Sequence, residues 1–360
     1  MHKTDDGLHP SPVEQQMLWM MNRARANPVA EGTWLEFTGD SIITAAINLL
    51  KVNIGKMKRE FSAIQPAPPA TFDRRLYEAS RRHSEYMISV NDQTHDGQGD
   101  KLNEMPFDWV TARLSIFAAC ESGLQCHAAL NIDYGVGPDG MQFPRGHRDA
   151  IMSNLGVGQD MLSSVGLAMV PEHNPLTANV GPYVFSAVYA SANDKWVDHY
   201  NRFVVGTVWE DRNRNKQYDE GEGLNNVKVD LDRRSWNAVT GIAGGFSFPV
   251  TAPGNYTVIF SGGNLPVPLF RSVTVGEFSA LVDMEISTPP VNPVPFATTV
   301  KRETNGSFTL KWLGGKGPYQ VQMTNRLNGA WRNSGLPTMA LTANLMPEGP
   351  AGFFRVVASE

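Results

Sequence analysis

The stretch DRNRNKQYDEGE, from Asp211 to Glu222, spaces its oxygen-bearing side chains as a calcium-binding loop does. Counted from Asp211, such side chains stand at positions 1, 3, 5, 9 and 12, and position 7 would supply its backbone carbonyl. The six candidate ligands are Asp211, Asn213, Asn215, Gln217, Asp219 and Glu222. Because EF-hand loops wrap Ca²⁺ in hard oxygen ligands of this order, the spacing predicts a calcium site.

One position departs from the EF-hand pattern. Lys216 stands at position 6, where glycine normally makes the sharp turn. A lysine adopts that turn at a conformational cost, which predicts a moderate affinity. The flanking segments VVGTVWED and NNVKVDL are extended rather than helical in pattern, so this is not an EF-hand domain. The alternative is a solvated acidic loop between two strands.

Four residues of the first half form a second candidate group: His95, Glu121, Asp133 and His147. His95 lies in the Gly- and Asp-rich stretch QTHDGQGD, Glu121 follows a mostly apolar run, and His147 opens a predicted helix after a glycine. Two histidines and one or two carboxylates from distant segments suit a divalent metal such as zinc, or an acid/base group. The alternative is that His147 only starts a helix and His95 only lies in a loop.

The segment that must position these residues, about 11–190, mixes helical and extended patterns. Ser11 begins the capping box Ser-Pro-Val-Glu of a first helix, which Pro28 ends. A second helical period runs through DRRLYEASRRHSEYMISVN, where His83 is in register with apolar residues and is predicted to be a core histidine. SSVGLAMV and PYVFSAVYA have the Val- and Tyr-rich pattern of strands, so this segment is predicted to be an α/β or α+β sandwich.

Helical periodicity is lost after Phe203. Short alternating segments separated by Gly, Asn and Pro predict a β-sandwich as far as residue 287. STPPVNPVP is typical of a semi-rigid linker, and residues 296–360 again have strand patterns. The last segment contains four aromatic residues that are either an exposed carbohydrate-binding strip or core residues: Trp312, Tyr319, Trp331 and Phe354.

Composition excludes several classes of protein. The net charge is −5 and no run of Lys or Arg exceeds two, so no basic stripe for nucleic acid exists. No stretch has the ~18 apolar residues of a membrane span, and the first ten residues lack the apolar core of a signal peptide. Cys120 and Cys126 are too few for a disulfide framework, and predict either a small disulfide loop or two buried thiols.

The order of motifs in residues 11–195 resembles the bacterial branch of the CAP superfamily, which groups cysteine-rich secretory, antigen 5 and pathogenesis-related proteins. LYEASRRHSEYM, THDGQGD, ESG and GHRDAIMSNLGVGQDMLSSVGLAMV carry the resemblance. It implies an α-β-α sandwich with a cleft of two histidines, matched by His95 and His147, and acidic residues. Glu121 matches one acid although ESG replaces the family's GEN-like motif, and Asp133 is the nearest candidate for the second.

Residues 203–287 resemble the B-type repeats of Cna/Sdr surface adhesins, through GTVWEDRNRNKQYDEGEGLNNVKVDL and GGFSFPVTAPGNYTVIF. The resemblance implies a prealbumin-like β-sandwich that binds structural calcium, and millimolar calcium implies an extracellular location. Residues 296–360 resemble, more loosely, fibronectin-III-like modules, through FTLKW, YQVQMTNRLNGAW and FFRV.

The predicted fold class is therefore a CAP-type α-β-α sandwich followed by two β-sandwich domains. The predicted boundaries are a tail at 1–10, then 11–197, 203–287, a linker at 288–295, and 296–360. The predicted function is a secreted or cell-surface protein whose cleft binds a divalent metal or a small ligand (lipid, peptide or glycan). One alternative is a metal-assisted hydrolase in which His95 and His147 hold the ion and Glu121 is the base. The other is a structural adhesion protein with an idle cleft.

Overall fold

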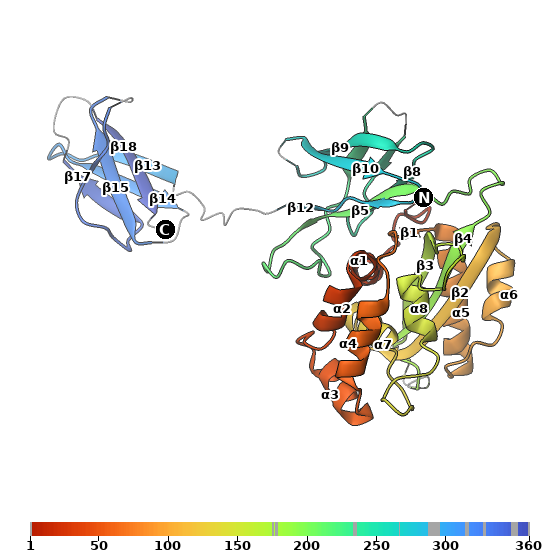
Figure 1. The fold of residues 1–360 in the computed structure, drawn as a ribbon. Coiled ribbons are helices and arrows are strands. Elements are labelled where there is room, and N and C mark those ends of the chain that lie inside the picture. Colours follow the sequence, from red (N-terminus) through yellow and green to blue (C-terminus); the bar gives the residue numbers. More distant parts are fainter. Residues whose placement is uncertain are drawn as a thin grey trace. The chain divides into compact units, whose positions relative to one another are not determined.

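A computed structural model describes the larger part of the chain (Figure 1). The described residues are 2–174, 176, 179–232, 236–265, 267–286, 296–313, 317–326, 329–346 and 352–358. The chain divides into two compact units, Met1–Ser287 and Thr288–Glu360. The regions predicted as separate domains at 11–197 and 203–287 lie in the first unit, and their division remains a prediction. The predicted linker at 288–295 lies outside the described residues.

The helices of the described residues all precede residue 153. Their bounds are α1 (Pro12–Ala26), α2 (Pro28–Trp34), α3 (Ser41–Leu50), α4 (Ile54–Ala63), α5 (Arg74–Val90), α6 (Gln98–Asn103), α7 (Gly123–Ile132) and α8 (Gly146–Met152). α1 begins at the predicted capping box, in which Glu14 Oε2 accepts the Ser11 N–H at 2.7 Å. α5 covers the predicted second helix, and α8 begins next to His147 as predicted.

A four-stranded sheet lies among these helices. It contains β1 (Thr71–Phe72), β3 (Ser164–Pro171), β4 (Tyr183–Ala192) and β2 (Trp109–Cys120), in the order β1-β3-β4-β2. β3 runs parallel to β1 and antiparallel to β4, which is also antiparallel to β2. Helices cover both faces, since alternate residues of β4 join different clusters: Phe185, Ala187 and Tyr189 pack with α1, α7 and α8, and Val188, Ala190 and Ala192 with α5 and α6.

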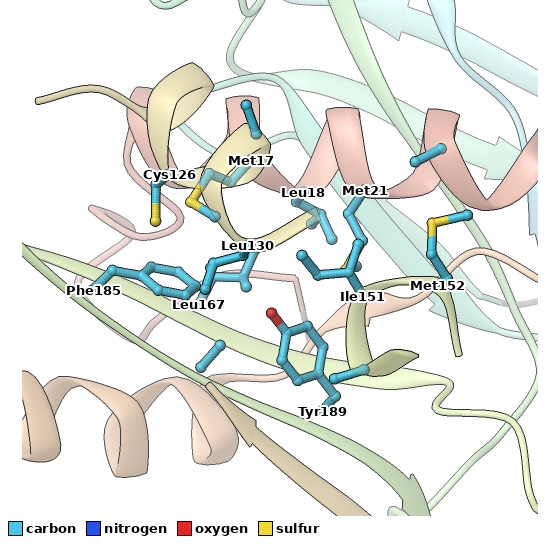
Figure 2. Packing of buried hydrophobic residues seen from close by; sticks show 14 of the residues in the cluster. Met17, Leu18, Met21, Cys126, Leu130, Ile151, Met152, Leu167, Phe185 and Tyr189 are labelled. Carbon is cyan, nitrogen blue, oxygen red and sulfur yellow. The ribbon is translucent and has the colours of Figure 1, made fainter. Parts of the chain in front are cut away.

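The main core of this part is shown in Figure 2. Met17, Leu18 and Met21 of α1 pack there with residues of α7, α8, β3 and β4. Cys126 points into the same core, and both cysteines are free thiols that are completely buried. Of the two alternatives predicted from the sequence, a disulfide loop or two buried thiols, the structure shows the two buried thiols.

Two further sheets complete the first unit. Their strands are β5 (Phe203–Glu210), β6 (Val227–Leu231), β7 (Asn237–Val239), β8 (Gly245–Pro249), β9 (Gly254–Gly262), β10 (Leu269–Val275), β11 (Ala280–Leu281) and β12 (Met284–Ile286). One sheet has the order β10-β9-β6-β7; in the other, β5 lies between β11 and β12 and also pairs with β8. Val, Phe and Tyr side chains of the two sheets form one core, so residues 203–286 are a β-sandwich.

The second unit has its own small core. Its strands are β13 (Phe296–Arg302), β14 (Phe308–Leu313), β15 (Tyr319–Thr324), β16 (Arg332–Asn333), β17 (Thr342–Leu345) and β18 (Phe353–Ala358). They form the sheets β13-β14-β17 and β16-β15-β18. Trp312 and Tyr319 are buried between them, at 1% and 6% exposure, so these two aromatic residues belong to the core and not to a carbohydrate-binding strip.

The predicted fold class is wrong in its first part, because a CAP α-β-α sandwich is not supported, whereas the β-sandwich predicted from residue 203 is present. The described chain is mainly β, with 18 strands against eight helices. The helices on both faces of the first sheet do not identify a CAP domain, because many unrelated sequences bury a sheet between helices in this way. Local periodicity predicted several elements correctly, among them α1, α5, β3 and β4, but it carries no information on which family's topology connects them.

Candidate functional site

The loop from Asp211 to Glu222 joins β5 to β6 and brings the predicted calcium ligands together. Asp219 Oδ2 accepts two amide N–H groups, from Asn213 Nδ2 at 2.6 Å and Asn215 Nδ2 at 2.7 Å. Glu222 closes the loop, because its Oε1 accepts the Arg212 N–H at 2.9 Å and its Oε2 accepts the Asp219 N–H at 3.0 Å. Two of the predicted ligands thus converge on a carboxylate oxygen of a third, and a fourth, Glu222, connects the two ends of the loop.

Asp211 lies at the buried end of this loop. Its side chain is 2% exposed. Its Oδ2 accepts the backbone N–H of Lys216 at 3.2 Å, whereas its Oδ1 is buried without a hydrogen-bond partner among the described residues. A buried carboxylate oxygen without a partner is costly unless a cation or a donor reaches it. This oxygen is therefore the best candidate for direct contact with an ion.

Lys216 adopts the turn that glycine makes in EF-hand loops. Its φ is +62°, in the left-handed region, as the sequence predicted. Its Nζ lies 2.5 Å from Glu285 Oε1 and 3.5 Å from Asp211 Oδ2. The hydrogen bond to Glu285 raises the pKa of Lys216. A positive charge therefore already stands beside the loop, on an exposed side chain.

The loop is also bonded to helix α1. Gln16 Nε2 donates to Asp219 Oδ1 at 3.1 Å, and Arg23 Nη1 donates to Gln217 Oε1 at 3.2 Å. Between these contacts, Trp19 and Met20 of α1 pack with two aromatic residues of the sandwich, Trp209 and Tyr218. Two of the six candidate ligands thus hold the sandwich against the helical part of the same unit.

Arg23 continues this contact into the helical part. Its Nη2 donates to Glu31 Oε2 at 2.8 Å, and Glu31 Oε1 lies 2.8 Å from His127 Nε2 and 3.2 Å from Asn131 Nδ2. Burial raises the pKa of Glu31, but Arg23 and His127 outweigh burial, so its pKa lies below the ordinary value. Sequence reasoning missed this network, because a charged residue on a helix gives no local signal that it is buried against another part of the chain.

The second predicted group is only partly assembled. His147 Nδ1 lies 2.9 Å from Asp133 Oδ1, and its backbone N–H donates to Asp133 Oδ2 at 3.2 Å. The Asp133 side chain is fully buried and the His147 side chain is 19% exposed. A buried carboxylate that orients an accessible imidazole is an arrangement suited to proton transfer.

The other two members of the group, His95 and Glu121, form their hydrogen bonds with other residues. His95 is exposed and its Nδ1 lies 2.7 Å from Gln98 Oε1. Glu121 is exposed, and its backbone N–H donates to Gln125 Oε1. Within the described ranges, no group of three or more His, Cys, Asp and Glu side chains is arranged to hold a metal ion. The roles of His95, Glu121, Asp133 and His147 remain predictions, and any calcium in the loop depends on amide and backbone oxygens as well as carboxylates.

Comparisons with known proteins give no family. No family model matches the chain, and no curated relative does either. Among solved structures, a DUF3823 family protein from Parabacteroides merdae is 18% identical over 45% of this chain and 92% of its own, with a TM-score of 0.18. A DUF3823 family protein from Bacteroides ovatus is 16% identical over 43% and 88%, with a TM-score of 0.17. A protein from Bacteroides uniformis described as a "putative carbohydrate binding protein" is 14% identical over 44% and 80%, with a TM-score of 0.19. TM-scores this low carry no argument about function.

These findings overturn the family predictions made from the sequence. The resemblance to the CAP superfamily is wrong: no family model matches, and the similar structures reported above are not described as CAP proteins. No family model supports the B-type and fibronectin-III-like assignments of the two later segments either. Short motifs in a shared order were insufficient to identify the family, because each motif specifies a local turn or cap that unrelated proteins also use.

Helix length and hydropathy bear on the membrane prediction. Within the described parts of the chain, no helix is both long and apolar enough to cross a membrane.

Proposed function

We propose that this chain is a secreted or cell-surface binding protein whose loop 211–222 holds a structural Ca²⁺. One observation carries the proposal: Asp211 Oδ1 is buried without a hydrogen-bond partner beside the carboxylate and amide groups of the same loop. The ion would be held by Asp211, Asn213, Asn215, Asp219, Glu222 and the backbone carbonyl of Gln217. When bound, Ca²⁺ supplies positive charge that offsets the repulsion among the carboxylates.

The contacts with α1 support a mechanical role for the ion. Asp219 and Gln217 belong to the candidate ligand set and also accept hydrogen bonds from Gln16 and Arg23. Ordering the loop would hold these two acceptors in place, so the ion would stiffen the junction between the sandwich and the helical part. The strained Lys216 turn is consistent with weak binding, which millimolar extracellular calcium satisfies.

Thermal unfolding of the full chain in 1 mM CaCl₂ and in EGTA tests the proposal. A ligand that binds only the native state stabilises it by about 1.4 kcal/mol at tenfold excess over Kd. We expect calcium to raise Tm by several degrees and calorimetric titration to show one site. Asp211→Asn, which keeps the shape of the side chain and removes its charge, should lose most of both effects.

Asp92→Asn is the matched control, because Asp92 is an exposed carboxylate outside the loop. It should respond to calcium as the parent protein does. A Tm that is equal in calcium and in EGTA, with no heat of binding in the titration, would contradict the proposal. An equal response in Asp211→Asn and Asp92→Asn would place the ion somewhere else.

A further inference from the structure

A surface pocket lies beside the connection between β4 and β5, away from the loop 211–222. Its volume is about 570 Å³. Most of its lining comes from residues 194–202, with further residues from the turns at 250–251 and 277. All of these residues belong to the first unit. A pocket of this size accommodates one or two sugar rings or an equivalent small ligand.

Two aromatic residues, Trp196 and the half-buried Tyr200, line this pocket, and the tryptophan is unusually exposed. Trp196 is 61% exposed, which makes it the most exposed of the eight tryptophans. Leaving a large apolar ring in water forgoes its hydrophobic stabilisation, so an exposed tryptophan beside a pocket points to a binding surface. Indole also offers a flat face and an N–H donor to a ligand that is apolar on one side and polar on the other.

Hydrogen bonds hold the backbone around Trp196 in one conformation. The Trp196 N–H donates to Asn193 O at 3.2 Å, and the His199 N–H donates to Trp196 O at 3.3 Å. His199 Nε2 accepts the Asp108 N–H at 2.8 Å, which leaves Nδ1–H to donate to Val197 O at 2.8 Å. A binding surface that is held in this way pays little conformational entropy when a ligand arrives.

The polar groups of the pocket are available for hydrogen bonding. Asp194, Lys195, Asp198 and Glu277 line it, and their side chains form no ion pair with any other residue in the described ranges. Three carboxylates and one ammonium offer acceptors and donors suited to hydroxyl groups. Arg202 also lines the pocket, and its guanidinium donates to the backbone carbonyls of residues 250, 251 and 276. Three carboxylates thus stand against two cations, and this excess of negative charge disfavours phosphate-bearing ligands such as nucleic acid.

We infer that this pocket binds a neutral carbohydrate chain, with Trp196 as the stacking platform. The C–H face of a sugar ring packs on the indole, and its hydroxyl groups bond with Asp194, Asp198 and Glu277. Both halves of the recognition are needed, because stacking alone does not select a sugar and carboxylates alone would select a cation. The inference does not depend on calcium in the loop 211–222.

The test is retention of the full chain by polysaccharides. Native gels containing starch, xylan or mixed-linkage β-glucan, and pull-downs on cellulose and chitin, should show retention by at least one polymer in 0.5 M NaCl. Trp196→Ala should weaken that binding roughly tenfold or more, as loss of a central tryptophan commonly does. Glu277→Gln, which keeps the size of the side chain, should weaken it less.

Trp236→Ala is the matched control, since Trp236 is 45% exposed and does not line the pocket. Its retention should equal that of the parent protein. The inference is overturned if no polymer retains the chain, or if Trp196→Ala binds as well as Trp236→Ala while both retain the parent Tm. Retention seen only at low salt and lost in 0.5 M NaCl overturns it as well, because stacking and hydrogen bonding to a neutral sugar do not depend on charge attraction.

Discussion

His83 shows how burial turns a histidine, a residue type that often does chemistry, into a structural residue. It is completely buried in α5, and its Nε2–H donates to Thr94 O at 2.8 Å. Its Nδ1 is buried without a partner among the described residues. This confirms that His83 is a core histidine, as its register with Leu76 and Met87 predicted.

Acid should destabilise the protein through His83. Burial lowers its pKa from 6.5 to about 4, so the unfolded chain takes up a proton between these values and the folded chain does not. The contribution of neutral His83 to the free energy of unfolding is therefore fully present above pH 6.5 and is lost as pH falls toward 4. We expect Tm to fall from pH 7 to pH 5, and to fall less in His83→Gln.

Comparing the two proteins at each pH isolates His83 from other titrating groups. Burial also lowers the pKa of His2 to about 4, so its contribution to the stability of the protein is lost over the same pH range. Asp283 has a pKa raised to about 6 by burial, so its contribution has the opposite sign. Both are unchanged in the variant. Parallel Tm curves for parent and His83→Gln would show that His83 does not titrate as its burial implies.

Elements were easier to predict from sequence than sites, for physical reasons that particular segments show. A capping box and a 3.6-residue period are local, so the beginning of α1 and the extent of α5 followed from sequence alone. The spacing in the loop 211–222 is local too, and the structure gathers those side chains. The contacts of Gln16 and Arg23 with the loop cross about 200 residues, and no local pattern encodes such a pairing.

The packing of α5 on β3 depends on one glycine. A Cβ on Gly166 would overlap the backbone of Leu76 and Tyr77, and Ser80 Oγ donates to Gly166 O at 2.9 Å at the same crossing. Backbone cannot move aside as a flexible side chain can. We expect Gly166→Ala to destabilise the first unit by roughly 1–3 kcal/mol, measured by urea unfolding.

Gly146→Ala is the control for that substitution. Gly146 has no heavy atom within 4 Å of the added Cβ and lies at the beginning of α8. It should change the free energy of unfolding by less than about 1 kcal/mol. A Gly166→Ala protein as stable as Gly146→Ala would mean that α5 moves off the sheet without cost.

At the scale of the whole molecule, the two units should respond differently to calcium. The second unit has its own core of Leu310, Trp312, Tyr319 and neighbouring residues, and the candidate calcium loop belongs to the first unit. We expect differential scanning calorimetry of the full chain to resolve two transitions. Chelation should lower only the transition of the larger enthalpy, because enthalpy scales with the number of residues that unfold.

Assignment of the transitions can be checked with a substitution in the second unit. Trp312→Phe removes part of a side chain that is 1% exposed and should lower only the smaller transition. A single transition would mean that the two units unfold as one cooperative body, and an equal shift of two transitions would mean that the ion stabilises both units. If chelation moved the smaller one alone, the ion would lie in the second unit.

Helix α1 is buried on nearly every side, since one set of its residues packs in the core of the helical part and Trp19 and Met20 pack on the sandwich. A fragment truncated near residue 197 would expose this second surface, and we expect such a fragment to aggregate. The sandwich is therefore not a module that recombination could exchange freely for another. In evolution, Trp19 and Trp209 would have to change together, so the two parts would be inherited as a pair.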